Sequence, residues 1–459
     1  MRRLFLLLLI VALASPALAQ VNGETYEKEG FTIIRVWGSH YEMGFAEGHF
    51  IAPKLKDLIE KYVLQQIPPL FWNAARAAYP TLFTEPSEIQ EELRGFIDGA
   101  VASGEDIYLE PLGRNVDILD LKVANTIADL STVDYFCSSF SAFGEATQDS
   151  ELDGALAISR NLDWAAWNDE DPFLLSRDTF ILVRRPSEPG YQPTVAITYP
   201  GFVGCLSCIN QAGVGAFMNQ GNNDLPQFLR IWNDGPYVPV VYAVREGLES
   251  ADFNGDMIST ADDVIEALQD KFYGTNLVHI VEPYQAPAGP AGVMEMQTLA
   301  GYTIRMPEDD ADIGPWRLGL TNQSRKLFPP DPCWRYDAIV QNVQSRSGRY
   351  DLDAMWEIMG LVALYDLEQG YTNQTMLYRT DTLELGLAKT DDEGFSVEKQ
   401  PVWFGIEDLI NPTPPVDDDT MDDADDSEDD DSEPTDDDDN DEGNGNSASD
   451  DDDEGNCCG

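Results

Sequence analysis

Apolar and polar residues follow two different periods along this chain, and the change falls near residue 137. Before it, residues 44–66, 87–103 and 112–130 carry apolar side chains at helical spacing, after a strand-like alternation over residues 28–36. After it, strand-like runs occur at 155–160, 179–184, 194–199, 203–209, 214–219, 277–282, 301–305 and 376–380, with helical patterns at 238–250, 261–271, 334–344 and 353–365. Strands with intervening helix pairs predict an α+β layered domain that follows a mostly helical N-terminal segment.

Residues 132–164 have the pattern of a β-hairpin built around a cysteine. Cys137 stands in a run of small hydroxyl and aromatic residues, a polar turn-rich stretch covers 147–154, and Arg160 and Asp163 follow it. Because the two strands of an antiparallel hairpin face each other, Arg160 and Asp163 can return to the level of Cys137. A nearby cation favours the thiolate, so this arrangement predicts a nucleophilic cysteine. The alternative is a buried structural thiol next to a surface ion pair.

The first 19 residues have the pattern of a secretory signal. Two arginines precede an apolar run that ends in Ala17-Leu18-Ala19, which predicts cleavage before Gln20. No later stretch offers the roughly 18 consecutive apolar residues of a membrane-spanning helix. We therefore expect an exported protein, secreted or periplasmic, without a transmembrane anchor.

The charge of the chain limits its partners. The 459 residues include 83 acids and 28 bases, for a net charge of −55, and 23 of the acids lie after residue 411. So acidic a surface excludes nucleic acid as a partner, because binding to phosphates requires a basic patch. The segment 411–459 has no base and no apolar face, which predicts a disordered acidic tail.

The few histidines narrow the chemistry further. They are His40, His49 and His279, so a Cys–His enzyme in the later part of the chain would have to use His279. That residue lies in an apolar strand-like run, where a packed histidine is the more common case. The sequence therefore favours a mechanism without histidine and without a cofactor. Cys205 and Cys208 have CxxC spacing in a strand-like run, which indicates a local disulfide or two buried thiols.

One stretch resembles the start of a calcium loop. Asp252, Asn254 and Asp256 place oxygen ligands at alternate positions, with Asp262 or Asp263 as later ligands. Met257, however, replaces the expected glycine, and no glutamate closes the loop. A solvated, Asx-rich turn is the favoured interpretation of this segment.

Several segments together resemble the N-terminal-nucleophile (Ntn) hydrolases, in particular the acyl-coenzyme A:6-aminopenicillin acyltransferase-like family, which is related to choloylglycine hydrolases and acid ceramidase. FCSSFSAFG and SRNLDW are similar to the nucleophile hairpin, and GSHYEMGFAEGHF to the propeptide signature. TYPGFVGCLSCINQAGVGAFMNQ is similar to the second hairpin, and TNQS and CWRYD to later site segments. The resemblance covers most of residues 30–410.

The resemblance implies an αββα four-layer sandwich and a chain that cleaves itself before Cys137. The domains would be a signal peptide (1–19), a helical prosegment (20–136) that stays associated after cleavage, a catalytic domain (137–410) and the acidic tail (411–459). Asp163 would then hold the new α-amine and Arg160 would set the electrostatics around the sulfur. Asn322 matches the family's oxyanion asparagine, with Asn219 as a second candidate.

The same resemblance assigns Arg335 to a family arginine near the nucleophile, although Cys333 stands where the family commonly has serine. Considered alone, Asn322 could cap a turn and Arg335 could be a surface base. The implied activity is hydrolysis or acyl transfer at a non-peptide amide of a small or lipid-like substrate. A non-catalytic, secreted acidic binding protein with a degenerate Ntn core remains the alternative.

Overall fold

The computed structural model describes residues 21–130, 136–166, 168, 170–221, 236–269, 274–283, 290–346, 349–367 and 370–412. The signal sequence and almost the whole acidic tail lie outside these residues. Within the described part of the chain, no helix is both long and apolar enough to cross a membrane.

The larger of the two main sheets combines the N-terminal segment with the later domain. Its nine strands follow the order β1-β2-β7-β8-β9-β10-β11-β12-β13, and all neighbours are antiparallel except β2 and β7. The strands are β1 (Gly23–Lys28), β2 (Phe31–Gly38), β7 (Phe180–Pro186), β8 (Thr194–Thr198), β9 (Ser207–Asn210), β10 (Gly215–Gln220), β11 (Thr275–Val281), β12 (Ala291–Gln297) and β13 (Gly301–Arg305). The N-terminal segment, which was expected to be mostly helical after one strand, supplies the edge hairpin of this sheet as well as helices.

The second main sheet carries the cysteine hairpin. Its main path is β14-β5-β6-β16-β17-β18, with β15 paired to β16. The strands are β5 (Phe136–Ala142), β6 (Ala157–Trp164), β14 (Arg317–Leu320), β15 (Tyr365–Asp366), β16 (Gly370–Arg379), β17 (Glu384–Lys389) and β18 (Val402–Gly405), and a separate small ribbon pairs β3 (Tyr108–Leu109) with β4 (Arg114–Asn115). The predicted hairpin is thus confirmed, with β5 and β6 paired between β14 on one side and β16 on the other.

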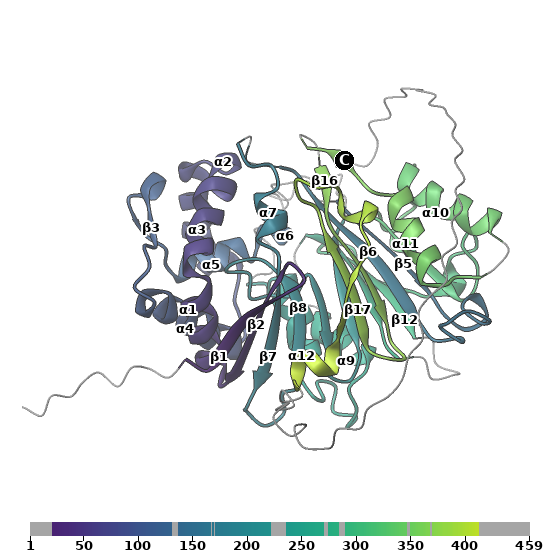
Figure 1. The fold of residues 1–459 in the computed structure, drawn as a ribbon, viewed down its shortest axis with the longest axis horizontal. Helices are drawn as coiled ribbons and strands as arrows, with labels where there is room; N and C mark the ends of the chain where they lie inside the picture. The colour runs from purple at the N-terminus through teal and green to yellow at the C-terminus, as the bar shows by residue number, and fades with distance from the viewer. Residues whose placement is uncertain are drawn as a thin grey trace, which may run out of the picture.

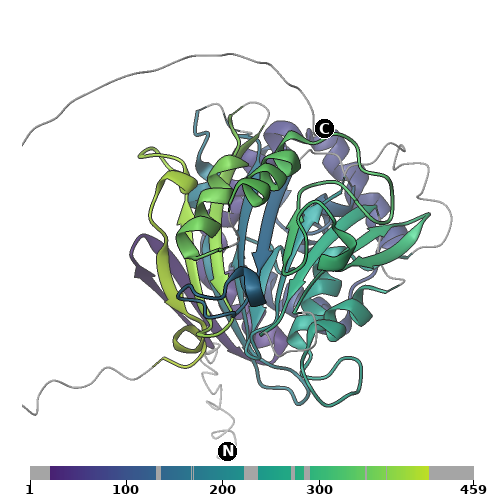
Figure 2. The ribbon, with the colours of Figure 1, turned by 90° about the vertical axis from the view of Figure 1, so that its right-hand side faces the viewer.

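The two main sheets pack face to face between layers of helices (Figures 1 and 2). Inward-facing apolar residues such as Ile33, Ile158 and Leu387 form the core between them. α1, α8 and α9 cover the outer face of the larger sheet, and α10 and α11 cover the outer face of the other sheet. This is the expected α+β fold with four αββα layers.

The helices of the described residues fall into an N-terminal group and a later group. They are α1 (His40–Leu58), α2 (Leu64–Gln66), α3 (Pro69–Leu82), α4 (Ser87–Ala102), α5 (Ile118–Ala124), α6 (Ile127–Leu130), α7 (Leu174–Arg177), α8 (Val240–Glu249), α9 (Ala261–Leu268), α10 (Trp334–Ser345), α11 (Leu352–Leu361) and α12 (Ile406–Ile410). α1 begins at a capping box between Ser39 and Glu42, and a π-helical turn over Ile59–Val63 separates α1 from α2.

α1 and α4 approach each other through paired glycines. A Cβ atom added to Gly44 or Gly48 would lie 2.0 Å from a backbone oxygen of α4, and one added to Gly95 or Gly99 would lie 2.0 Å from a backbone oxygen of α1. Each helix therefore presents a small residue at i and i+4, and only the missing side chains allow this close contact.

A buried charge cluster joins these N-terminal helices to the later domain. Glu92 of α4 accepts hydrogen bonds from Arg184 of β7 (3.0 Å) and from Arg245 of α8 (2.9 Å). Arg245 also donates to Glu249 at 3.0 Å, and Glu47 of α1 lies 3.7 Å from Arg184. All five side chains are buried, so the N-terminal segment is joined to the domain by charges as well as by the β2–β7 pairing.

Some local predictions needed correction. The run at 28–36 is divided by a turn at Glu29 and Gly30, which both have positive φ, so it belongs to two strands instead of one. α3 was missed because its sequence contains prolines, yet Pro69 occupies the first helical position, where no donor is needed. β12, β14, β17 and β18 were also missed. Cys205 and Cys208 form the local disulfide that was one of the two expectations.

Candidate active site

Cys137 lies near the start of β5, buried at 1% exposure. In the β5–β6 register Cys137 faces Leu162, Ser139 faces Arg160 and Phe136 faces Asp163. Arg160 Nη2 lies 3.5 Å from Cys137 Sγ. Burial raises the pKa of the Cys137 thiol, and the positive charge of Arg160 acts in the opposite direction by favouring the thiolate.

Arg160 reaches from one sheet to the other. Its Nη1 donates to Asn219 Oδ1 at 2.7 Å and its Nη2 to the carbonyl oxygen of Met218 at 2.7 Å, both on β10. The Nδ2 atom of Asn219 donates in turn to the carbonyl of Thr321 at 3.0 Å. The guanidinium next to the sulfur is therefore held in place by the strand of the second predicted hairpin.

The backbone of Cys137 is surrounded by a second set of groups. Its N–H donates to Asn322 Oδ1 at 3.1 Å, and its carbonyl oxygen lies 3.4 Å from Arg335 Nη1. The same Nη1 atom donates to Asp163 Oδ2 at 3.1 Å, while Nη2 of Arg335 donates to Asn322 Oδ1. Arg335 thus connects the asparagine, the aspartate and the peptide unit of the cysteine.

Asp163 is fully buried at the end of β6. Besides Arg335 it accepts a hydrogen bond from Thr372 Oγ1 at 2.6 Å. Burial raises the pKa of Asp163 to about 6, against the opposing effects of Arg335 and Thr372. Among the described residues, the cation nearest to Asp163 is Arg335. The atom that accepts from the Cys137 nitrogen is Asn322 Oδ1, not an oxygen of Asp163.

The two asparagines are placed differently from a ready oxyanion hole. In the intact chain the Nδ2 atom of Asn322 donates to the carbonyl of Gln220 at 2.7 Å, and the Nδ2 atom of Asn219 donates to Thr321. The amide oxygens of the two side chains, in contrast, face the cysteine nitrogen and Arg160. The oxyanion role of either asparagine stays a prediction.

A carboxylate that the sequence analysis missed holds the loop of Asn322. Glu295 of β12 is fully buried and accepts hydrogen bonds from Arg305 Nε (2.9 Å), from the Ser324 hydroxyl, and from the backbone N–H groups of Arg325 (3.0 Å), Lys326 (2.8 Å) and Leu327 (2.8 Å). These donors begin two residues after Asn322. For Glu295 the available signal was a single acid inside the apolar run 291–297. For Thr372 the signal was the threonine-rich start of β16.

His279 is not arranged to act on the cysteine. Its ring nitrogens lie 2.9 Å from the hydroxyls of Ser139 and Ser141, the two residues that follow Cys137 on the same face of β5. Burial, together with the nearby Arg305 and Arg160, lowers the pKa of His279 to about 3. It is a neutral inter-sheet bridge, which disfavours the Cys–His mechanism.

The calcium candidate has a different geometry from a cation site. Asn254 Oδ1 accepts from the N–H of Asp256 at 3.0 Å, and both carboxylate oxygens of Asp263 accept backbone N–H groups. Within the described ranges, no group of three or more His, Cys, Asp or Glu side chains could hold a metal ion. The segment is an Asx-rich turn in this structure.

Comparison with known proteins gives only distant likenesses. No family profile matches the chain. An uncharacterised protein of Archaeoglobus fulgidus is 26% identical over 210 residues, which cover 41% of this chain and 33% of that protein. The match therefore spans about a third of the relative's length.

Among solved structures, the Caenorhabditis elegans N-acylethanolamine-hydrolyzing acid amidase (NAAA) ortholog is similar, with a TM-score of 0.39 and 17% identity over 53% of this chain and 92% of that one. Penicillin V acylase from Agrobacterium tumefaciens gives a TM-score of 0.38 with 11% identity over 60% and 89%. A mutant conjugated bile acid hydrolase from Clostridium perfringens gives 0.34 with 11% identity over 59% and 92%. At these scores the likenesses decide nothing about activity, so the functional argument rests on the site around Cys137.

Proposed function

We propose that this chain is an exported, self-processing Ntn hydrolase or acyltransferase that acts on non-peptide amides through Cys137. The observation that carries the proposal is the surroundings of this one residue. Arg160 lies next to the sulfur of Cys137, and Asn322 Oδ1 lies next to its backbone nitrogen. Arg335 binds both Asn322 and Asp163. A structural cysteine requires none of these groups, whereas a cation at the sulfur and a polar partner at the backbone nitrogen suit a nucleophile that becomes an N-terminal residue.

Maturation would use the same sulfur. Sγ attacks the carbonyl carbon of Phe136, the C–N bond to Cys137 breaks, and a thioester links the two residues. Water then hydrolyses the thioester, which releases the Phe136 carboxylate and leaves Cys137 with a free thiol and a free α-amine. Arg335 is well placed to hold the chain during this step, because its guanidinium also lies 5.5 Å from the centre of the Phe136 ring.

In the mature protein the α-amine is the general base. An α-amino group titrates near ~7.7–8.0, so at neutral pH it can accept the thiol proton. The thiolate attacks the substrate amide, the leaving amine receives that proton, and an acyl-enzyme forms on Sγ. Water completes hydrolysis, or a second amine completes acyl transfer.

The geometry supports a changed division of roles between Asn322 and Asp163. Asn322 Oδ1 already accepts from the Cys137 nitrogen, so after cleavage it can orient the α-amine directly. Asp163 acts one step further out, by orienting Arg335 through the bond between Nη1 and Oδ2. An oxyanion would then need an amide nitrogen of Asn322 or Asn219 to leave its present carbonyl partner.

The N-terminal segment should remain bound after cleavage. It holds strand β2 next to β7 and it contributes Glu92 to the charge cluster with Arg184 and Arg245. Removing the segment would leave the two buried arginines without this carboxylate, which is strongly unfavourable.

The substrate class follows from the site and from the charge of the protein. A buried thiol at an amide-cleaving site leaves three classes of small substrate open: neutral acyl amides, which include lipid-like amides, then lactams, and N-acyl amino acids. The net charge of −55 disfavours an anionic polymer. A non-catalytic acidic binding protein remains the second candidate, and its support is the same charge.

The test is turnover of a panel of N-acyl amides by the purified mature protein, with Cys137→Ala as the blank. We expect a stoichiometric acyl adduct on Cys137, detected by mass spectrometry after acid quench, and loss of activity after thiol alkylation. Equal rates in wild type and in Cys137→Ala would reject the proposal and favour the binding-protein alternative.

A further inference from the structure

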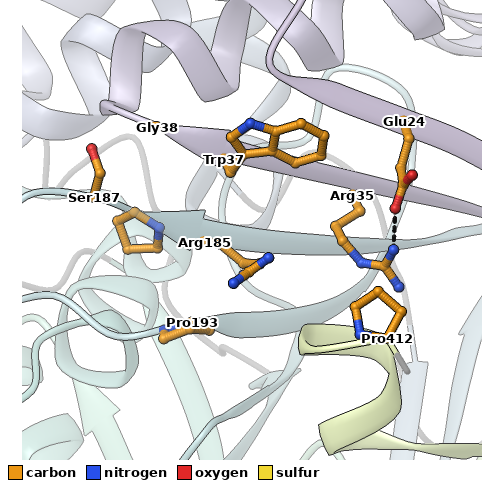
Figure 3. Close-up of a pocket in the computed structure, with 9 residues that line it drawn as sticks. Glu24, Arg35, Trp37, Gly38, Arg185, Ser187, Pro193 and Pro412 are labelled. Carbon is orange, nitrogen blue, oxygen red and sulfur yellow. Dashed lines mark hydrogen bonds and ion pairs between the residues drawn. The ribbon is translucent and has the colours of Figure 1, made fainter. Parts of the chain in front are cut away.

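A groove of about 540 Å³ lies away from Cys137 (Figure 3). Residues from near both ends of the described chain and from residues 185–193 line it. Trp37 of β2 and its register partner Arg185 of β7 lie side by side in the lining, and Pro193, just before β8, completes this part of it. The rim includes Pro412, which is the last described residue. The groove therefore combines an indole, a guanidinium and prolines.

Arg185 is the unusual member of this lining. It is half-buried, and it makes no ion pair or hydrogen bond with any side chain in the described ranges. Its neighbours differ: Arg184 is bound to Glu92 on the opposite face of the strand, and Arg35 across the groove is paired with Glu24. In a chain with 83 acids and only 28 bases, this half-buried guanidinium is available to an acidic partner.

We propose that residues 413–419, the start of the acidic tail, occupy this groove. The chain leaves Pro412 on the rim and continues as Thr-Pro-Pro-Val-Asp-Asp-Asp. Prolines favour an extended polyproline II conformation, which packs well against accessible aromatic rings, and Trp37 is partly exposed in the groove. The aspartates that follow can then form a charge-assisted hydrogen bond with Arg185.

Because residues 413–419 belong to the same chain as the groove, a weak contact is sufficient to hold them there. Seven extended residues span up to roughly 20 Å, and Pro412 already touches the groove, so the segment does not have to cross open solvent. The tethered segment is present at the groove at a millimolar effective concentration, so binding does not depend on an encounter between two molecules. A single exposed ion pair changes an equilibrium by at most about fivefold, so the prolines on Trp37 must contribute as well. The acids beyond residue 419 are not part of the contact.

Photocrosslinking of the full chain tests this directly. With p-benzoylphenylalanine in place of Val416, we expect an intramolecular cross-link to the peptides that contain Trp37 or residues 185–193, located by tandem mass spectrometry. Replacing Asp417, Asp418 and Asp419 with Asn should lower the yield by at least about threefold, because these acids pair with Arg185. Neither change alters the described core, so misfolding cannot mimic the result.

Two matched controls complete the design. Asn at positions 436–438 removes the same charge from the far tail and should leave the yield unchanged. Arg185→Glu should abolish most of the cross-link, whereas Arg349→Glu, an equal charge change at an exposed arginine, should not. Cross-links to other surfaces, cross-links only between two chains, no cross-link, or equal losses in both arginine variants would each overturn the proposal.

Discussion

The chemistry of the site depends on different groups that contact the sulfur and the backbone nitrogen of Cys137. The sulfur of Cys137 faces a guanidinium held by β10, and its nitrogen faces an amide oxygen held by Arg335. Burial alone would keep the thiol protonated, since it raises the pKa of Cys137. The cation at 3.5 Å opposes that effect only in part, because the pKa of the thiol still lies above its ordinary value, so the nucleophile needs a base to take its proton.

Glu295 should act through Asn322, because its buried carboxylate holds the backbone that follows this asparagine. We expect Asn322→Ala to lower turnover by about 10²–10³-fold and Glu295→Gln to lower it by about 10–10²-fold. If one acts through the other, the double variant should be no slower than Asn322→Ala alone. Steady-state kcat on one amide substrate measures all three.

Asp310→Asn provides the matched control for that cycle. Asp310 accepts hydrogen bonds from the same Arg305 at 2.9 Å and from the Tyr336 hydroxyl, but none from residues 324–327. Its effect on kcat should be small and should add to that of Asn322→Ala. Additive losses for Glu295→Gln and Asn322→Ala would show that Glu295 has only a general structural role.

At the scale of elements, the site is assembled by strands that are distant in sequence. The loop that follows β14 places Asn322 next to the hairpin of Cys137, β16 places Thr372 there, and α10 places Arg335 there. The six candidate residues could be named from motifs that resemble a family, and the structure brings all six together. The sequence carried weak signals for Glu295 and Thr372, but it could not assign their roles, because those roles depend on strand order. It could not orient the amide of Asn322 either.

The helix pair α1–α4 gives a prediction at this scale. Gly48→Ala would place a methyl group 2.0 Å from the Phe96 carbonyl, so the helices must separate. We expect a loss of about 1–3 kcal/mol in the free energy of unfolding, measured by urea denaturation in an uncleavable Cys137→Ala background.

Gly360→Ala in α11 is the control, because a Cβ there meets no heavy atom within 4 Å. It should leave stability unchanged or raise it by up to about 1 kcal/mol. Equal effects of the two substitutions would mean that the close approach of α1 and α4 does not contribute to stability.

At the scale of the whole molecule, the N-terminal segment and the later domain share one sheet and one charge cluster. The α+β class was predictable because strand and helix periods differ strongly after residue 137, whereas the four layers were implied only by the family resemblance. The pairing of the N-terminal hairpin with the larger sheet was not predictable. β2 pairs in parallel with a strand roughly 150 residues later, and no local pattern encodes such a partner.

The charge cluster predicts a pH dependence of stability. Burial raises the pKa of Glu47 to about 7, from an ordinary value of 4.5, so between these values the folded chain holds a proton that the unfolded chain has released. Stability should therefore fall as the pH rises, by roughly 2–3 kcal/mol between pH 5 and 8 from this group. His40, whose pKa is also raised, through its hydrogen bond and charge contact with Glu249 and against the effect of burial, acts in the same direction.

Urea denaturation of the Cys137→Ala protein at pH 5 and pH 8 measures this difference. Glu47→Gln should reduce it by that amount, and Glu266→Gln, at an exposed position on α9, should leave it unchanged. A difference that persists fully in Glu47→Gln would show that Glu47 is not the titrating group.

The most direct test of the central claim is the intact mass and N-terminal sequence of the purified mature protein. If Cys137 becomes an N-terminal nucleophile, the wild type should contain a fragment that begins with Cys137, still associated with the N-terminal segment in size-exclusion chromatography. Cys137→Ala should remain one uncleaved chain. A wild type that hydrolyses an amide while its Phe136–Cys137 bond is intact would contradict the account.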